Sequence, residues 1–155
     1  MIRVAVNGAC GRLGSRIVAQ VRQDKELELV AALEREGHPL IGKDIGASAG
    51  EGPCGIKITP SFNGKADVLI DFSEPASSVA KASFCASQGI ALVIGTTGHN
   101  PEQLSSIREA TRHIPCLMTP NMSLGVNLLF QMAAQVAKAL GEDYDIEILE
   151  VHHRF

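Results

Sequence analysis

The sequence predicts an α/β fold in which a parallel β-sheet is covered by helices on both faces. Short runs rich in valine, isoleucine and leucine alternate with amphipathic helical segments, and this alternation is typical of parallel strands joined by helices. The strand segments are continuous apolar runs, as expected for strands buried on both faces. With 45% hydrophobic and 20% charged residues in 155, the composition is that of a globular domain and disfavours disorder or a coiled coil.

The first half of the chain is expected to contain a strand, a helix and a second strand, followed by a long loop. The first strand covers residues 3–6, and the helix covers 12–23, where apolar residues recur at four-residue spacing. The second strand covers 27–33. Residues 36–65 are rich in glycine and show little periodicity, which predicts a loop with at most one edge strand around 56–58.

The second half continues the alternation of strands and helices. The expected elements are, in order, strand 67–72, helix 75–88, strand 91–94, helix 101–112, strand 116–118, helix 124–140 and strand 145–151. Gly89 and Gly141 follow two of these helices, in the position where glycine commonly ends a helix, and Ser123 can cap the last one. That last helix is apolar over most of its circumference, which predicts either a subunit interface or cover from a part of the protein outside this chain.

Composition also excludes several classes of function. The formal net charge of −3 and the absence of tryptophan argue against a nucleic-acid binder, which needs basic patches and stacking surfaces. No signal peptide or transmembrane segment is expected. The four cysteines lie more than 30 positions apart, which favours reduced thiols in a cytoplasmic protein over disulfides or a zinc site. No metal-binding constellation is expected.

A glycine-rich motif stands between the first strand and the first helix. Residues 8–14 read Gly-Ala-Cys-Gly-Arg-Leu-Gly. Glycines at such a junction allow a tight turn, close approach of a pyrophosphate and close helix–strand packing, while the helix N-terminus attracts the anion. The spacing G-x-x-G-x-x-G differs from the commoner G-x-G-x-x-G, so a structural turn and an S-adenosylmethionine site remain alternatives.

An acidic and a basic residue follow the second strand, twenty residues beyond the last glycine of this motif. Glu34 can accept hydrogen bonds from the ribose of an adenosine, and Arg35 can pair with a 2′-phosphate. Together they predict use of either NADH or NADPH. The alternative is a solvated pair of charges at a strand end.

Three further segments carry groups suited to chemistry. Residues 95–98 (Gly-Thr-Thr-Gly) and 119–123 (Thr-Pro-Asn-Met-Ser) follow two neighbouring strands, at the sheet edge where ligands bind in open parallel sheets. Near the C-terminal end, His152 and His153 precede Arg154. An imidazole can transfer a proton near neutral pH, and the guanidinium can pair with a carboxylate. For each segment, an ordinary turn or chain end is the alternative.

Taken together, these motifs resemble the dihydrodipicolinate reductase family. The matching segments are G-A-C-G-R-L-G at 8–14, A-A-L-E-R-E-G at 31–37, D-F-S-E-P at 71–75, V-I-G-T-T-G at 93–98, N-M-S-L-G-V-N at 121–127 and D-I-E-I-L-E-V-H-H-R at 145–154. They occur in the family's order over essentially the whole chain. Cys10 stands where many relatives carry glycine.

The resemblance implies a Rossmann-like, doubly wound parallel sheet and a reductase of the diaminopimelate route to lysine. Such an enzyme passes hydride from NADH or NADPH to 4-hydroxy-tetrahydrodipicolinate, a cyclic dicarboxylate, giving tetrahydrodipicolinate. The implied cofactor-binding residues are Gly8, Ala9, Cys10, Gly11, Arg12, Leu13, Glu34, Arg35, Gly95, Thr96, Thr97, Thr119, Pro120, Asn121 and Met122. His152 matches the family's acid/base and His153 a substrate contact. The complete family protein is expected to be a cytoplasmic homotetramer, without a nucleic-acid or membrane partner.

The resemblance also divides the chain. Residues 1–123 are expected to form the dinucleotide-binding domain, and 124–155 the first helix and strand of a truncated α+β substrate domain. The family's motif continues beyond H-H-R to a lysine and a serine-glycine-threonine segment that this chain lacks, so the fragment is expected to bind cofactor and turn over weakly or not at all. The alternatives are a non-catalytic NAD(P)-binding module and another Rossmann dehydrogenase.

Overall fold

The computed structural model describes residues 1–149 and 151, which divide into two compact units, residues 1–120 and the described residues from 121 onward. The first unit is a sheet of parallel strands connected by helices, so the predicted fold class is confirmed. The predicted domains, 1–123 and 124–155, have a similar boundary. Their assignment to cofactor and substrate binding stays a prediction.

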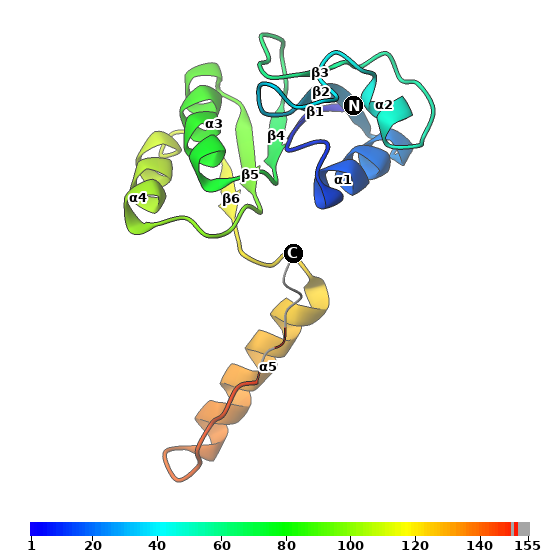
Figure 1. The fold of residues 1–155 in the computed structure, drawn as a ribbon. Coiled ribbons are helices and arrows are strands. Elements are labelled where there is room, and N and C mark those ends of the chain that lie inside the picture. Colours follow the sequence, from blue (N-terminus) through cyan, green and yellow to red (C-terminus); the bar gives the residue numbers. More distant parts are fainter. Residues whose placement is uncertain (150, 152–155) are drawn as a thin grey trace. The chain divides into compact units, whose positions relative to one another are not determined.

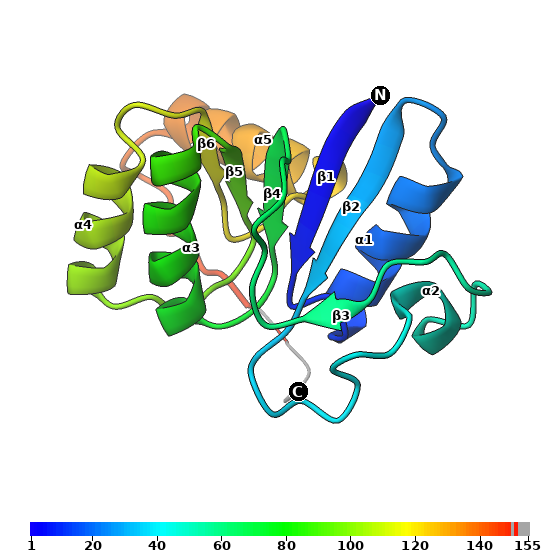
Figure 2. The same cartoon turned by 90° about the horizontal axis from the view of Figure 1, so that it is seen from above.

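The sheet of the first unit has the strand order β3-β2-β1-β4-β5-β6, and every neighbouring pair is parallel. Figure 2 shows β6, β5, β4, β1 and β2 side by side. The strands are β1 (Ile2–Asn7), β2 (Leu27–Leu33), β3 (Ile58–Thr59), β4 (Val68–Asp71), β5 (Ala91–Ile94) and β6 (Cys116–Met118). From β1 the chain proceeds outward to β3, returns to the other side of β1 as β4, and proceeds outward again to β6. The strand order therefore reverses between β1 and β4.

Two of the helices that join these strands have the predicted bounds, and the third, predicted at 101–112, ends two residues earlier. They are α1 (Arg12–Gln23), α3 (Pro75–Gln88) and α4 (Pro101–Ala110). Proline occupies the first turn of α3 and α4, where its missing N–H costs no hydrogen bond. In α4 the Asn100 side chain accepts from the Gln103 backbone and the Gln103 side chain accepts from the Asn100 backbone, which makes a capping box. Gly89 ends α3 in a left-handed conformation with φ of 67°.

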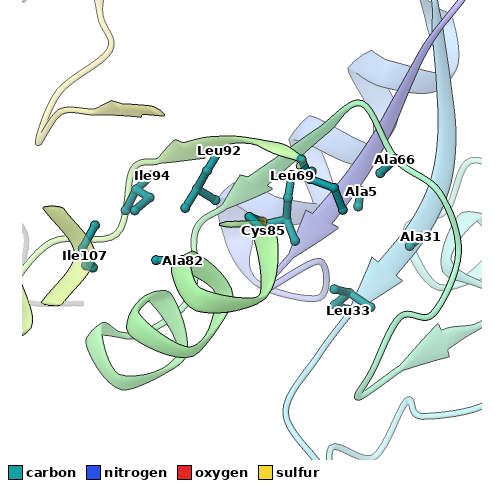
Figure 3. Packing of buried hydrophobic residues seen from close by; sticks show 11 residues of the cluster. Ala5, Ala31, Leu33, Ala66, Leu69, Ala82, Cys85, Leu92, Ile94 and Ile107 are labelled. Carbon is teal, nitrogen blue, oxygen red and sulfur yellow. The ribbon is translucent and has the colours of Figure 1, made fainter. Parts of the chain in front are cut away.

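Apolar side chains fill both faces of the sheet. On one face, Leu69, Leu92 and Ile94 pack with Ala82 and Cys85 of α3, as Figure 3 shows. On the other face, Val4, Val6 and Ala32 pack with Val18 and Val21 of α1. Figure 1 shows α3 and α4 on one side of the strands and α1 on the other. This two-sided burial explains the continuous apolar runs in the sequence.

The segment predicted as a loop, residues 36–65, contains a short helix that the sequence analysis missed. This helix is α2 (Ile45–Ser48), and the strand expected around 56–58 is β3 at Ile58–Thr59. Asp44 organises the segment, because its carboxylate accepts backbone N–H bonds from Ala47 (3.0 Å), Cys54 (3.1 Å) and Gly55 (2.7 Å). One side chain therefore caps α2 and closes the following turn. A four-residue helix is too short for periodicity to reveal it.

The hydrogen bonds of two aspartates predict how stability depends on pH. Backbone hydrogen bonds, that from Ala47 first, lower the pKa of Asp44 to about 2, and the Arg3 side chain does the same for Asp67. Their ordinary value is 3.8. Because a lowered pKa in the folded state stabilises it above the unfolded-state pKa, this contribution is lost as pH falls from about 4 to about 2.

We therefore expect the free energy of unfolding to fall over that interval, and to fall less steeply in Asp44→Asn and Asp67→Asn variants. Urea unfolding followed by circular dichroism at several pH values measures it. The exposed Asp24→Asn change is the matched control and should leave the slope unchanged. Equal slopes in all four proteins would show that these two carboxylates are not responsible.

The second unit contains α5 (Leu124–Leu140), which the sequence predicts with the same bounds. Ser123 caps it by accepting from the Val126 N–H at 3.4 Å. No residue of α5 is buried in the described chain, although most of its residues are apolar. The strand predicted at 145–151 is wrong for the residues described there, 145–149 and 151, which adopt no strand. No strand of the described residues pairs with them in a hydrogen-bonded ladder. Among the described residues, no helix has the length and apolar character needed to span a bilayer.

Candidate cofactor site at the strand-order reversal

The glycine motif forms a tight turn from β1 into α1. Gly8 has φ of +73°, and its N–H and that of Ala9 both donate to the Leu33 carbonyl of β2, at 3.0 and 3.1 Å. The Gly11 N–H donates to the Gly8 carbonyl at 3.0 Å. Gly11 is the N-cap residue and supplies no side-chain acceptor. The first N–H groups of α1 are therefore available for an anion, as at other helix N-termini.

The same turn brings backbone segments closer together than any side chain would permit. A Cβ on Gly14 would lie 2.0 Å from the Gly8 carbonyl oxygen, and a Cβ on Gly8 would lie 2.3 Å from the Phe72 carbonyl oxygen. Gly14 thus brings α1 against the turn, and Gly8 brings the turn against the end of β4. These are the packing functions expected for glycines in a dinucleotide-binding turn.

Glu34 lies beside this turn at the end of β2. Its Oε2 accepts from the Cys10 N–H at 3.3 Å, and its Oε1 accepts from the Arg35 N–H at 3.0 Å. Burial, followed by the negative charge of Glu34, raises the pKa of the Cys10 thiol to about 11. Glu34 is half-buried and Arg35 is exposed. The carboxylate is thereby fixed next to the glycine turn, while the guanidinium is free to reach a ligand.

A pocket of about 250 Å³ opens between these segments. It is lined by Asn7, Gly8, Gly11, Glu34, Arg35, Phe72, Ser73, Glu74 and Ser77. Its walls are the carboxyl ends of β1 and β4, where the strand order reverses, together with Glu34 and Arg35 after β2. Ligands of open α/β sheets bind in such a crevice. The fold therefore brings Gly8, Gly11, Glu34 and Arg35 together around one cavity.

A buried aspartate connects the strand ends that form this pocket. Asp71 is fully buried, and its Oδ1 accepts from Asn7 Nδ2 at 2.7 Å and from Ser73 Oγ at 2.6 Å. Its Oδ2 accepts from Ser78 Oγ of α3 and from Thr96 Oγ1 at 3.3 Å. Thr96 Oγ1 in turn accepts from the Ser73 N–H at 2.9 Å. One carboxylate thus joins β1, β4, α3 and the loop after β5.

The sequence analysis assigned no role to Asp71. It is an acidic residue at the end of an otherwise apolar strand, and this is the signal that could have marked it. Neighbouring groups show how apolar the surroundings are: burial lowers the pKa of Lys81, although the charge of Asp71 opposes this, and burial raises the pKa of Cys85 to about 12. A buried carboxylate depends on its hydrogen-bond donors, and Asp71 has four of them.

A second cavity, of about 240 Å³, lies at the ends of β5 and β6. It is lined by Thr96, Thr97, Gly98, His99, Leu104, Met118, Thr119 and Pro120. The sequence places Thr96, Thr97, Thr119 and Pro120 in one site, and the structure brings them to one cavity. Gly95 lies just before it, and a Cβ there would meet the Phe72 ring at 2.0 Å. Sequence analysis gave no role to His99, whose Nε2 is buried without a hydrogen-bond partner among the described residues.

The other predicted site residues are not among those that line these two cavities. Arg12 and Leu13 begin α1 beyond the lining of the first pocket, and both are exposed. Asn121 and Met122 belong to the second unit. His152 and His153 lie outside the described residues.

Residues 2–122 match the family described as Dihydrodipicolinate reductase, N-terminus, and residues 125–155 match Dihydrodipicolinate reductase, C-terminus. The chain belongs to the dihydrodipicolinate reductase family. The resemblance found in the sequence motifs is thus confirmed. The matches include both the N-terminal and the C-terminal region that define the family.

Individual members of the dihydrodipicolinate reductase family agree with this assignment. A 4-hydroxy-tetrahydrodipicolinate reductase from Citrifermentans bemidjiense is 47% identical over 157 residues, covering 99% of this chain and 59% of the relative. One from Anaeromyxobacter dehalogenans is 45% identical, covering 99% of this chain and 58% of the relative. The chain therefore spans less than two thirds of the length of these curated relatives.

Solved structures show the same fold. A dipicolinate-bound dihydrodipicolinate reductase from Paenisporosarcina sp. TG-14 aligns with a TM-score of 0.65 at 27% identity, covering 88% of this chain and 53% of that one. A myo-inositol 2-dehydrogenase from Lactobacillus plantarum aligns with a TM-score of 0.60 at 10% identity, covering 86% of this chain and 41% of that one. The second likeness concerns the fold alone.

Proposed function

We propose that this chain is the dinucleotide-binding part of a 4-hydroxy-tetrahydrodipicolinate reductase, which passes hydride from NADH or NADPH to its cyclic dicarboxylate substrate. The observation that carries the proposal is the pocket at the reversal of strand order, where the glycine turn and Glu34 meet. Membership of the dihydrodipicolinate reductase family supports the reaction class. The dipicolinate bound to the structural neighbour supports a dicarboxylate ligand.

The first pocket and the start of α1 just beyond its lining have distinct roles in this proposal. The N–H groups at the start of α1, after Gly11, bind the pyrophosphate, because they present partial positive charge without internal acceptors. Glu34 accepts hydrogen bonds from the adenosine ribose, and its two backbone contacts hold it in position. Arg35 pairs with a 2′-phosphate when NADPH is the ligand.

The second cavity is proposed to hold the nicotinamide half. The hydroxyl and backbone groups of residues 96–98 and 119–120 line it. A cofactor-binding role for Asn121 and Met122 is proposed from the family resemblance alone. His152 would serve as the acid/base and His153 as a substrate contact, a proposal that rests on the family resemblance. The nicotinamide supplies the hydride when bound, and the protein orients it and provides the proton. Consumption of NADPH on adding 4-hydroxy-tetrahydrodipicolinate is the direct assay of the reaction.

Arg35 and Glu34 provide the test of the cofactor site. In Arg35→Ala the Kd for NADPH should rise roughly tenfold, because a charge-assisted hydrogen bond is lost, while the Kd for NADH should change less than about threefold. Glu34→Gln should weaken NADH binding more than NADPH binding. Fluorescence titration of the reduced dinucleotides measures both.

The control for this test is Arg108→Ala, which removes an exposed arginine from α4, away from the pocket. It should leave both Kd values unchanged. Equal weakening of NADH and NADPH by Arg35→Ala would contradict the assigned role of Arg35, and no measurable binding of either dinucleotide to the parent chain would overturn the proposed cofactor site.

A further inference from the structure

Beside the first pocket, the fold assembles three side chains that commonly bind metal ions. Cys10 lies in the glycine turn, Glu34 at the end of β2 and His38 in the turn that follows β2. One ligand atom from each, a thiol sulfur, a carboxylate oxygen and an imidazole nitrogen, lies within 4.8 Å of the other two. All three residues are half-buried. The sequence predicted no metal site, because its four cysteines lie more than 30 positions apart.

Backbone contacts hold the three residues near one another. The Cys10 N–H donates to Glu34 Oε2 at 3.3 Å, which ties the glycine turn to the end of β2. The His38 N–H donates to the Arg35 carbonyl at 3.2 Å, and the Leu40 N–H donates to His38 Nδ1 at 3.3 Å. These bonds close a turn that folds the imidazole back toward Glu34. The cluster is thus a product of the fold and is not an accident of adjacent sequence.

We propose that Cys10, Glu34 and His38 bind a zinc ion. Thiolate, carboxylate and imidazole are the three protein ligand types that zinc uses, and three of them leave the fourth tetrahedral position to water. Ligand atoms around tetrahedral zinc lie about 3.3 to 3.6 Å apart, given bond lengths near 2.0 to 2.3 Å. The observed separations, within 4.8 Å, need a contraction that small side-chain rotations supply.

The binding step exchanges ligands without any change of oxidation state. The Cys10 thiol loses its proton to solvent as sulfur binds the metal, and Glu34 binds through one carboxylate oxygen. His38 gives up the long hydrogen bond from Leu40 with either ligand atom, because Nδ1 then holds the metal or, when Nε2 is the ligand, the ring proton. The dication also relieves the repulsion between a thiolate and a carboxylate placed side by side.

Zinc binding would also affect the cofactor site. This consequence rests on the proposed function. Glu34 is the residue assigned to the adenosine ribose, so a carboxylate bound to zinc cannot accept the ribose hydroxyls in the same geometry. Cys10 also belongs to the turn that meets the pyrophosphate. Zinc and the dinucleotide should therefore exclude each other, which would make the site inhibitory.

Cadmium is the probe for the metal site, because its ultraviolet thiolate-to-metal charge-transfer absorption reports directly on a cysteine ligand. Titration of the reduced chain with Cd²⁺ should show one equivalent with this band, and Zn²⁺ should displace it. Cys10→Ser should abolish the band, and His38→Gln should raise the Kd for Cd²⁺ at least tenfold. The matched controls are Cys54→Ser, a half-buried cysteine, and Cys116→Ser, an exposed one; both should retain the band.

A band that survives Cys10→Ser, or that disappears in Cys54→Ser or Cys116→Ser, would place the metal elsewhere and overturn the proposal. An unchanged Kd for Cd²⁺ in His38→Gln would show that His38 is not a ligand and would overturn the three-ligand site. Competition is tested separately: saturating Zn²⁺ should raise the apparent Kd of the parent for NADH at least tenfold, and in Cys10→Ser by much less. Unchanged NADH affinity with zinc bound would refute the mutual exclusion of zinc and NADH. If NADH fails to bind even without metal, the cofactor proposal fails and the cadmium titration still decides the metal site.

Discussion

Replacement of Gly14 by alanine should destabilise the first unit by about 2 kcal/mol. Two opposing effects determine this value. Alanine is the better helix former, by about 1 kcal/mol in a helix interior. The added methyl group would lie 2.0 Å from the Gly8 carbonyl oxygen and 3.0 Å from the Ala9 Cα. Overpacking against backbone costs about 3 kcal/mol, since no side chain can rotate away, and the clash exceeds the gain in helix propensity.

Gly11→Ala is the matched control for this experiment. Gly11 lies in the same turn with an ordinary φ of −68°, and an added Cβ would meet only the Gly8 carbonyl oxygen, at 3.2 Å. We expect a loss below about 1 kcal/mol for that change. Urea unfolding at neutral pH compares the two variants. Equal stability of Gly14→Ala and Gly11→Ala would show that the turn can relax, and would remove the packing role assigned to Gly14.

Replacement of Asp71 by alanine should cost about 3 kcal/mol, the largest single effect that we expect. It removes the acceptor shared by Asn7, Ser73, Ser78 and Thr96 in a fully buried position. Each hydrogen bond to a charged acceptor contributes about 1.5 to 3 kcal/mol, and the losses are not additive because the freed donors rearrange.

Asp71→Asn separates the hydrogen-bonding role of this residue from the filling of space. It keeps one acceptor oxygen and almost the same volume, and the serine and threonine hydroxyls can rotate to accept from its amide. We expect a loss of about 1 to 2 kcal/mol for this variant. Ser83→Ala, on an exposed position of α3, is the control and should change stability by less than about 0.5 kcal/mol. If Asp71→Asn proves as unstable as Asp71→Ala, the charge itself is required.

The sheet could be predicted from the sequence because its signals are local. Each strand of the core is a continuous apolar run, and two of the main helices carry a marked end, Gly89 after α3 and Ser123 before α5. Helix α2 could not be predicted in the same way. It exists because the Asp44 carboxylate also binds N–H groups of Cys54 and Gly55, ten and eleven residues away, and no periodic pattern records such a contact.

The same difference between local and long-range signals applies to the residues of the candidate site. Gly8, Gly11 and Glu34 were predicted because a strand–glycine–helix sequence with an acidic residue twenty positions later is itself the signal. Asp71 and His38 were missed, since their partners come from other strands and turns. Their importance depends on strand pairing, such as that of Asn7 with Asp71, which brings together residues 64 positions apart.

The position of β1 in the sheet has a consequence for biosynthesis. β1 pairs with β2 on one edge and with β4 on the other, and β4 is encoded 64 residues later. At translation speeds of about 5 to 20 residues per second, the edge of β1 that pairs with β4 stays unpaired for roughly 3 to 13 seconds. Throughout that interval the nascent polypeptide presents an unpaired, apolar strand edge, the kind of surface that invites association with other chains. Protection of this edge during synthesis should therefore reduce such association.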